Sequence, residues 1–281
     1  MDILNILILA IVQGAAELLP VSSSAHVIVA EKIMGLDPTA PAMTLLLVML
    51  HTGTMFAVIA YFWKDWRSAY FSSMRLALQN GALIFYATIA TGIVGLSLQA
   101  AIKYLFAGNS TSFEIENLFG NSQLMAAALA AAGILIIASS FIKPSPNGSL
   151  STFRAIAIGS IQGLCLPFRG FSRSGATIST GLVLGVARRK AEEFSFALAV
   201  VLTPAVIVKE IYRLYKHQNI SPTLNASGFL HMLTPGLLGM AFSFAAGLLA
   251  LRWLSSWLES GRWYLFGAYC LVASLVVLGI G

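Results

Sequence analysis

Two clusters of polar residues interrupt an otherwise apolar chain, and both contain groups that can handle phosphate. The first cluster runs from Gln13 and Glu17 through a serine-rich stretch to His26. Gln13 and Glu17 are four residues apart, so their side chains share one face of a helix. The second cluster, Gly170-Phe171-Ser172-Arg173-Ser174-Gly175, offers a guanidinium group, two hydroxyl groups and pliable backbone N–H groups. Phosphate groups bind donors of these kinds.

Each ionisable member of the clusters has a functional and a structural interpretation. Charged groups are costly inside a membrane protein and are therefore functional candidates by default. Glu17 is a candidate metal ligand or general base, and the alternative is that it caps a helix or pairs internally. Arg173 is a candidate phosphate ligand, and the alternative is that it only pairs with Glu17. His26 is a candidate catalytic group or a plain interhelical hydrogen-bonding residue.

Together, histidine, serine, a carboxylate and an arginine suit phosphoryl transfer. One group attacks phosphorus, one takes up the proton, and cations stabilise the negative charge that spreads in the transition state. The spacing leaves the attacking group open among Ser23, His26 and a water molecule. Thr177 lies one turn beyond the second cluster and adds another hydroxyl group.

The composition indicates that these clusters lie in a polytopic membrane protein. Of the 281 residues, 58% are hydrophobic and only 10% are charged, against roughly 25% charged in soluble domains. A soluble protein of this size cannot cover its surface with so few charges. The net charge of +6 therefore predicts basic residues at a membrane surface, with no nucleic-acid partner. Cys165 and Cys270 both lie in apolar stretches, which argues against a disulfide framework.

The fold class predicted is all-α, with six transmembrane helices and two re-entrant helical hairpins. A spanning helix needs about 20 mostly apolar residues, and six stretches qualify: 42–63, 80–102, 123–142, 194–212, 229–251 and 263–280. Two further apolar regions, 3–34 and 155–187, are each broken by one polar cluster. Irregular backbone is tolerated at membrane depth only when it is buried in protein or faces water. The alternative for each region is one spanning helix plus one surface helix.

The two broken regions resemble each other, which predicts an inverted-topology repeat. Ile11-Val12-Gln13-Gly14 matches Ser160-Ile161-Gln162-Gly163, and a serine-containing tip follows in both regions. The chain is then a single membrane domain, 1–281, with repeat halves of roughly 1–142 and 143–281. Ten basic residues fall in segments predicted to be cytoplasmic and five on the opposite side, as the positive-inside rule expects. Broken helices of this kind often build anion sites near the bilayer midplane.

Other polar residues are weaker candidates. His51 lies within a predicted span and is expected to pack against neighbours or to line a cavity. The pairs Glu114/Glu116 and Glu192/Glu193 are expected to be solvated charges at helix ends. No P-loop, dinucleotide-binding fingerprint or zinc-type spacing of cysteine and histidine is present in the sequence.

The motifs resemble those of the undecaprenyl-diphosphate phosphatases of the bacitracin-resistance (BacA) type. Residues 13–17 and 19–26 resemble that family's Glu/Gln-x-x-x-Glu motif and the Leu-x-Val-Ser-Ser-Ser stretch after it. Residues 170–177 resemble its Pro-Gly-x-Ser-Arg-Ser-x-x-Thr motif. Gly185-Val186, the stretch 193–200, the length and the hydropathy plan also agree, so the resemblance spans the chain.

The resemblance implies an integral membrane phosphatase that hydrolyses the C55 isoprenoid diphosphate and thereby recycles the lipid carrier of cell-wall synthesis. It implies a divalent cation, Mg²⁺ or Ca²⁺, and a site in the bacterial inner membrane that opens toward the periplasm. Membrane lipids surround such a protein, and a homodimer is compatible with the sequence. The predicted catalytic residues are Glu17, Ser23, His26 and Arg173, and the predicted metal ligands are Glu17 and Gln13. The predicted substrate-binding residues are Gln13, Ser22, Ser172, Arg173, Ser174 and Thr177.

The sequence departs from the family pattern at two places. Gln13 stands where many members have glutamate, and losing that carboxylate can weaken or move cation binding. The usual Trp-Pro-Gly lead-in to the second motif is replaced by Pro167-Phe168-Arg169-Gly170, which is one residue longer and adds a cation. The second departure bears on fine specificity more than on the type of reaction.

Two rival functions belong to other classes. A transporter or flippase of an anionic lipid or solute fits inverted repeats with broken helices equally well, and Arg173 would then bind the anion without chemistry. A non-catalytic scaffold leaves the clustering of Glu17, His26 and Arg173 unexplained. Phosphate release from a pure lipid diphosphate separates the enzyme from the transporter.

Overall fold

A computed structural model describes residues 2–36, 41–107, 121–143, 145–168, 170–218 and 226–280. All of its regular elements are α-helices, and these described ranges contain no strand. Arg169 and the pair Glu114/Glu116 lie outside the described residues. The helices in chain order are α1 (Ile3–Leu18), α2 (Ser23–Ile33), α3 (Pro41–Tyr70), α4 (Met74–Ala107), α5 (Ser122–Ser140), α6 (Thr152–Cys165), α7 (Arg173–Val183), α8 (Arg188–Gln218), α9 (Ala226–Glu259) and α10 (Trp263–Ile280).

Several helices are apolar and long enough to cross a membrane, as expected for a multi-pass membrane protein. Such segments are Leu45–Tyr70, Met74–Leu105, Ser122–Ser140 and Thr234–Glu259. They lie in α3, α4, α5 and α9 and coincide with four of the six predicted spans. α8 covers the predicted span 194–212, and α10 holds a shorter apolar helix, Trp263–Gly279.

Both polar clusters separate two helices, as predicted. α1 ends at Leu18 and α2 begins at Ser23, and α6 ends at Cys165 before α7 begins at Arg173. Pro20 in the first gap lacks the N–H that a continuing helix would need, and Ser22 adopts a left-handed φ of 67°. We call residues 19–22 the first tip and the described residues of 166–172 the second tip. Gly170 in the second tip has a φ of 101°, which favours glycine.

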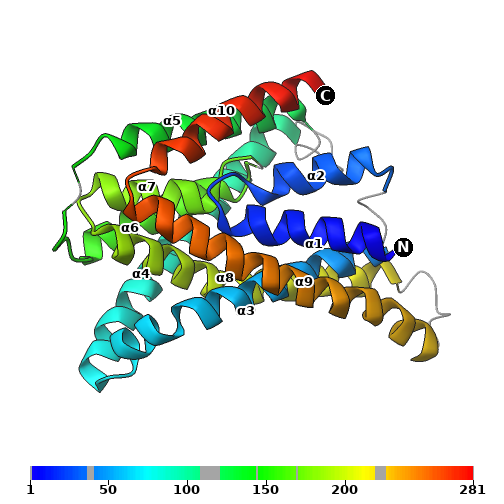
Figure 1. The fold of residues 1–281 in the computed structure, drawn as a ribbon, viewed down its shortest axis with the longest axis horizontal. Coiled ribbons are helices and arrows are strands. Elements are labelled where there is room, and N and C mark those ends of the chain that lie inside the picture. The colour runs from blue at the N-terminus through cyan, green and yellow to red at the C-terminus, as the bar shows by residue number, and fades with distance from the viewer. Residues whose placement is uncertain are drawn as a thin grey trace.

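The helices pack in pairs that enclose the two tips. α1 and α3 both pack on α9, α4 packs on α6, and α5 packs on α10. Each short helix after a tip lies against the helix before it, so that α1 and α2 form one pair and α6 and α7 another (Figure 1). α7 also contacts α5 and α8, which places the second tip and the start of α7 inside the helix bundle.

Small residues let some of these helices approach closely. A Cβ atom added at Gly159 of α6 would lie 2.1 Å from the backbone oxygen of Ala87 in α4. The buried Thr91 hydroxyl group donates a hydrogen bond to the Gly159 carbonyl oxygen at 2.8 Å. Close backbone approach through small residues is a usual way for membrane helices to associate.

A charged network joins α3, α8 and α9. Arg189 lies 2.6 Å from the Asp65 carboxylate and 3.2 Å from that of Glu193. The expectation of two solvated glutamates is wrong for Glu192, which is fully buried, lies 3.6 Å from Arg189 and accepts a hydrogen bond from the Ser255 hydroxyl group. The end of α9 packs over this turn of α8 and removes Glu192 from water.

Substituting Gly159 tests the close contact between α4 and α6. Gly159→Ala is expected to destabilise the fold by about 1–3 kcal/mol, because the new methyl group meets backbone that cannot rotate away. Thermal unfolding of detergent-purified protein measures this loss as a lower melting temperature. Gly92→Ala, on α4, is the matched control, because nothing lies within 4 Å of its added Cβ. Equal melting temperatures for the two variants would contradict the close contact.

Candidate active site

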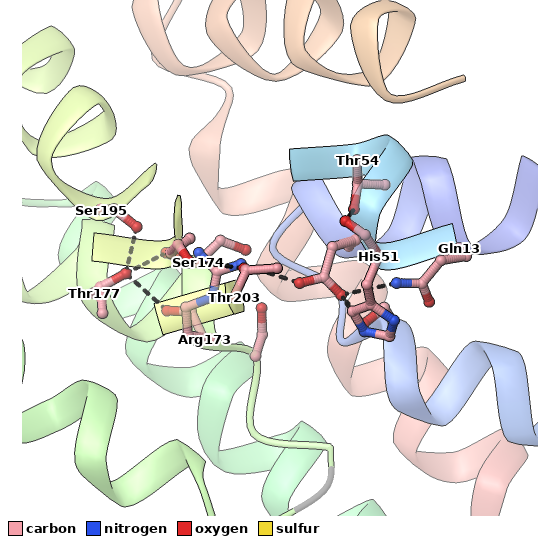
Figure 2. Close-up of polar contacts among 12 residues, drawn as sticks. Gln13, His51, Thr54, Arg173, Ser174, Thr177, Ser195 and Thr203 are labelled. Atoms are coloured by element: carbon pink, nitrogen blue, oxygen red, sulfur yellow. Dashed lines mark hydrogen bonds and ion pairs between the residues drawn. The ribbon is translucent and has the colours of Figure 1, made fainter. Parts of the chain in front are cut away.

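The Glu17 carboxylate is the centre at which the predicted site residues meet. Its Oε1 atom lies 3.1 Å from Nη2 of Arg173. Its Oε2 atom accepts hydrogen bonds from the Ser23 hydroxyl group at 2.6 Å and from the Gln13 amide group at 3.1 Å. Figure 2 shows Arg173 and Gln13 approaching from opposite sides, from α7 and α1. Glu17 therefore pairs with a residue 156 positions away in the sequence.

Helix ends position these groups. Glu17 lies in the last turn of α1, and Gln13 lies one turn earlier on the same face. Ser23 and Arg173 are the first residues of α2 and α7. The N-terminus of a helix carries a partial positive charge and unpaired N–H groups, so both helix starts favour an anion.

His51 is a residue of the site that the sequence analysis did not select. Its Nε2 atom lies 3.7 Å from Oε2 of Glu17, and its Nδ1 atom is 2.8 Å from the Leu47 carbonyl oxygen. The His51 side chain is 37% exposed and that of Glu17 is 20% exposed, so the imidazole is the more accessible of the two groups. A histidine within an apolar span was the available signal, since ionisable groups in spans are functional candidates.

His26 is held by contacts other than Glu17. Its Nδ1 atom lies 2.7 Å from the Ser22 carbonyl oxygen, and its Nε2 atom lies 2.6 Å from the Tyr269 hydroxyl group of α10. A carbonyl oxygen only accepts, so these partners assign the proton of the neutral ring to Nδ1, and Nε2 accepts from Tyr269. The two rings stack with centroids 5.6 Å apart. The catalytic role predicted for His26 stays a prediction, as does the substrate contact predicted for Ser22.

Hydroxyl groups of the second polar cluster bond to the backbone. Ser172 caps α7 by accepting a hydrogen bond from the Gly175 N–H group at 3.2 Å. The buried Ser174 hydroxyl group donates to the Leu19 carbonyl oxygen at 3.2 Å, which joins the second polar cluster to the first tip. These bonds fix the position of the start of α7 against the end of α1.

Thr177 supports the same helix start from inside the protein. It is fully buried, and its hydroxyl group donates to the Arg173 carbonyl oxygen at 2.8 Å and lies 2.6 Å from Ser195 Oγ of α8. Figure 2 shows Thr177 and Ser195 on the side of Arg173 that is remote from His51. The phosphate contacts predicted for Ser172, Ser174 and Thr177 stay predictions.

Arg173 has a donor that the protein leaves unused. Nη2 is bound to Glu17, whereas Nη1 is buried and has no hydrogen-bond partner within the part of the chain that the structure describes. A buried donor without a partner is costly, and such groups are found at sites that bind ligands. The guanidinium group can therefore hold Glu17 with one nitrogen and offer another to an anion.

Comparison with known proteins identifies the family. A family model described as bacitracin resistance protein BacA matches residues 6–276. The chain belongs to the BacA family. An undecaprenyl-diphosphatase 2 of Acinetobacter baylyi is 62% identical over 278 residues, which are 99% of this chain and 98% of the relative. An undecaprenyl-diphosphatase of Korarchaeum cryptofilum is 30% identical over the full length of both chains, and one of Desulfosudis oleivorans is 32% identical over 98% of this chain and 97% of its own.

The site residues of this BacA family member fit a divalent cation only in part. Glu17 supplies one carboxylate, and Gln13 supplies an amide whose oxygen and nitrogen exchange places on rotation. No three residues among histidine, cysteine, aspartate and glutamate gather into a metal site within the described ranges. Mg²⁺ is commonly held by one or two carboxylates together with substrate phosphates. The residues present fit a cation whose remaining ligands come from a diphosphate.

Removing the Ser174 hydroxyl group tests the bond between the two clusters. Ser174→Ala is expected to destabilise the protein by about 1 kcal/mol, because the buried Leu19 carbonyl loses its donor. Thermal unfolding in detergent measures the effect. Thr180→Val is the control on the same helix, because the Thr180 hydroxyl group bonds to the Ala176 carbonyl of its own helix. A loss for Thr180→Val as large as that for Ser174→Ala would show that the contact between clusters contributes nothing.

Proposed function

We propose that this protein hydrolyses undecaprenyl diphosphate to undecaprenyl phosphate and inorganic phosphate, recycling the lipid carrier of cell-wall synthesis. Membership of the BacA family and relatives named undecaprenyl-diphosphatase along the full chain support this activity. The observation that carries it is the contact of Ser23 with Glu17, beside the ion pair of Glu17 with Arg173. A hydroxyl group and a cation thus both contact one base, and phosphoryl transfer needs these three groups together.

The proposal includes six membrane spans and two re-entrant hairpins that form an inverted repeat in the bacterial inner membrane, with the site toward the periplasm. Equal helix order in the two halves supports the repeat, since α1–α5 and α6–α10 each begin with two short helices around a tip. The contacts agree as well. Matching α1 with α6 and α9 with α4 makes the contact of α1 with α9 equivalent to that of α6 with α4, and α3 packs on its own counterpart α8.

The diphosphate would bind between the two tips, with the isoprenoid tail among the helices. Arg173 donates to a phosphate oxygen through Nη1, and the starts of α2 and α7 add N–H donors and favourable dipoles. His51, whose side chain is more exposed than that of Glu17, would line the approach to the site. These donors stabilise the charge that develops on the phosphate in the transition state.

Glu17 would act as the base for Ser23. The Ser23 oxygen attacks the terminal phosphorus as its proton passes to Glu17. A bond from serine oxygen to phosphorus forms, the bridging phosphorus–oxygen bond breaks, and its electron pair leaves with undecaprenyl phosphate. Glu17 releases the proton to water and then takes one from the water molecule that attacks the phosphoserine, and returns it to the departing Ser23 oxygen. Glu17 and Gln13 would hold Mg²⁺ or Ca²⁺, which supplies charge neutralisation and orientation of the phosphates.

Phosphate release by an arginine variant tests the activity. Arg173→Lys keeps a positive charge for Glu17 but loses the planar fork of donors. Release of phosphate from undecaprenyl diphosphate by detergent-purified protein with Mg²⁺ or Ca²⁺ is expected to fall by about 10²-fold or more, at an unchanged melting temperature. Arg188→Lys is the control, because Arg188 bonds the Glu259 carbonyl oxygen outside the site. Absence of release by the folded wild type under either cation would favour the transporter.

Trapping the covalent intermediate tests Ser23. With substrate labelled in its terminal phosphate, wild-type protein is expected to carry a label that survives acid and is lost in base, because phosphoserine is stable in acid and labile in base. Ser23→Ala should lose both the label and turnover, whereas Ser68→Ala, at the exposed end of α3, should keep both. An acid-labile label would move the attack to His26, and turnover without any label would favour direct attack by water.

A further inference from the structure

His51 has no role in the proposed hydrolysis so far beyond lining the approach, although its imidazole faces the Glu17 carboxylate. It comes from α3, while the predicted site residues come from α1, α2 and α7 and from the tips between them. α3 is thus the fourth helix that contributes a residue to the site (Figure 2).

The hydrogen bond at the other ring nitrogen, Nδ1, sets the tautomer of the neutral His51 ring. Nδ1 lies 2.8 Å from the Leu47 carbonyl oxygen, and that oxygen only accepts, so Nδ1 carries a proton. In the neutral ring, Nε2 is then a lone pair directed at the site. Histidines that bind metals are commonly fixed in this way, with the second nitrogen donating to a backbone carbonyl.

With the ring neutral, Nε2 of His51 and Oε2 of Glu17 are two acceptors that face each other. Their separation of 3.7 Å is too long for a direct hydrogen bond. Two lone pairs at this distance repel unless a positive group lies near both of them. The Gln13 amide group donates to the same Oε2 atom, so the amide and the imidazole both lie beside one carboxylate oxygen.

We propose that His51 is a ligand, through Nε2, for the divalent cation of this site, beside Glu17 and Gln13. This inference rests on the proposed function, because the diphosphate supplies the remaining ligands. Of the three protein ligands only Glu17 is charged, and Arg173 already pairs with it. The chain therefore binds the cation together with a diphosphate and only weakly without one.

A nitrogen ligand changes which cations the site prefers. Oxygen-only sites suit Mg²⁺ and Ca²⁺, whereas imidazole is a better ligand for first-row transition metals. The site is thus expected to bind Mn²⁺ in preference to Ca²⁺. This preference is expected to depend on His51 and to decrease when an amide replaces the imidazole.

Pulsed electron paramagnetic resonance of bound Mn²⁺ tests the ligand directly. The sample is purified full-length protein with Mn²⁺ and methylene diphosphonate, a diphosphate that cannot be hydrolysed. The electron spin echo of Mn²⁺ is expected to show modulation by a directly bound ¹⁴N nucleus. His51→Gln should lose the modulation while keeping the wild-type melting temperature, and the matched variant His26→Gln should retain it.

Two results would overturn the proposal. One is the absence of ¹⁴N modulation in wild-type protein. That result would mean that Mn²⁺ stays in solution or binds through oxygen only, as it would if His51 were protonated and bound a phosphate oxygen instead. The other is modulation that persists in His51→Gln and disappears in His26→Gln, which would give the nitrogen to His26.

A second measurement separates this proposal from the proposed hydrolysis. In His51→Gln, the Mn²⁺ concentration for half-maximal phosphate release is expected to rise about tenfold or more, and the Ca²⁺ concentration to rise less. Equal shifts for the two cations would count against a nitrogen ligand. Wild-type protein that shows ¹⁴N modulation but releases no phosphate would leave the cation site standing and refute the hydrolase.

Discussion

The need to satisfy one partly buried carboxylate organises the centre of this protein. Glu17 lies in an apolar environment where an unpaired charge would be strongly unfavourable, and its hydrogen-bond partners are all donors. They come from both hairpins, so the cost of burying the charge is fully offset only when the two hairpins meet. The fold and the candidate site thus depend on the same contact. The ion pair of Arg173 with Glu17, which the sequence analysis gave as the alternative to phosphate binding, is part of the geometry of the proposed site.

The long apolar helices and the polar breaks between helices could be predicted from the sequence, because both depend on residues that are close together in the chain. Pro20, which lacks an N–H group, and Gly170, which has a positive φ, lie in the two breaks, and both breaks lie where the residues predicted them. The meeting of Glu17 with Arg173 followed from the small set of charges in apolar surroundings. The local sequence pattern was enough to predict features that depend on a few characteristic residues, such as a helix break or a charge in apolar surroundings.

Contacts between distant helices were not readable in the same way. His51 is separated from both clusters in the sequence, and only the packing of α3 beside α1 brings it to Glu17. The burial of Glu192 likewise depends on α9 lying over α8, which no spacing within residues 188–193 expresses. Tyr269 reaches His26 from the last helix of the chain. Periodicity describes one helix at a time, whereas these partners depend on how helices cross.

The ion pair at the tips also bears on how a phosphate leaves. Glu17 is the counter-ion of Arg173 at 3.1 Å, so a phosphate bound at Nη1 in the proposed site would share the guanidinium charge with a permanently tethered carboxylate. The negative charge of that carboxylate would weaken the binding of the phosphate product and shorten the time for which it is retained. A site with a built-in counter-charge would bind its ligand less tightly but release it faster, and this would favour repeated turnover.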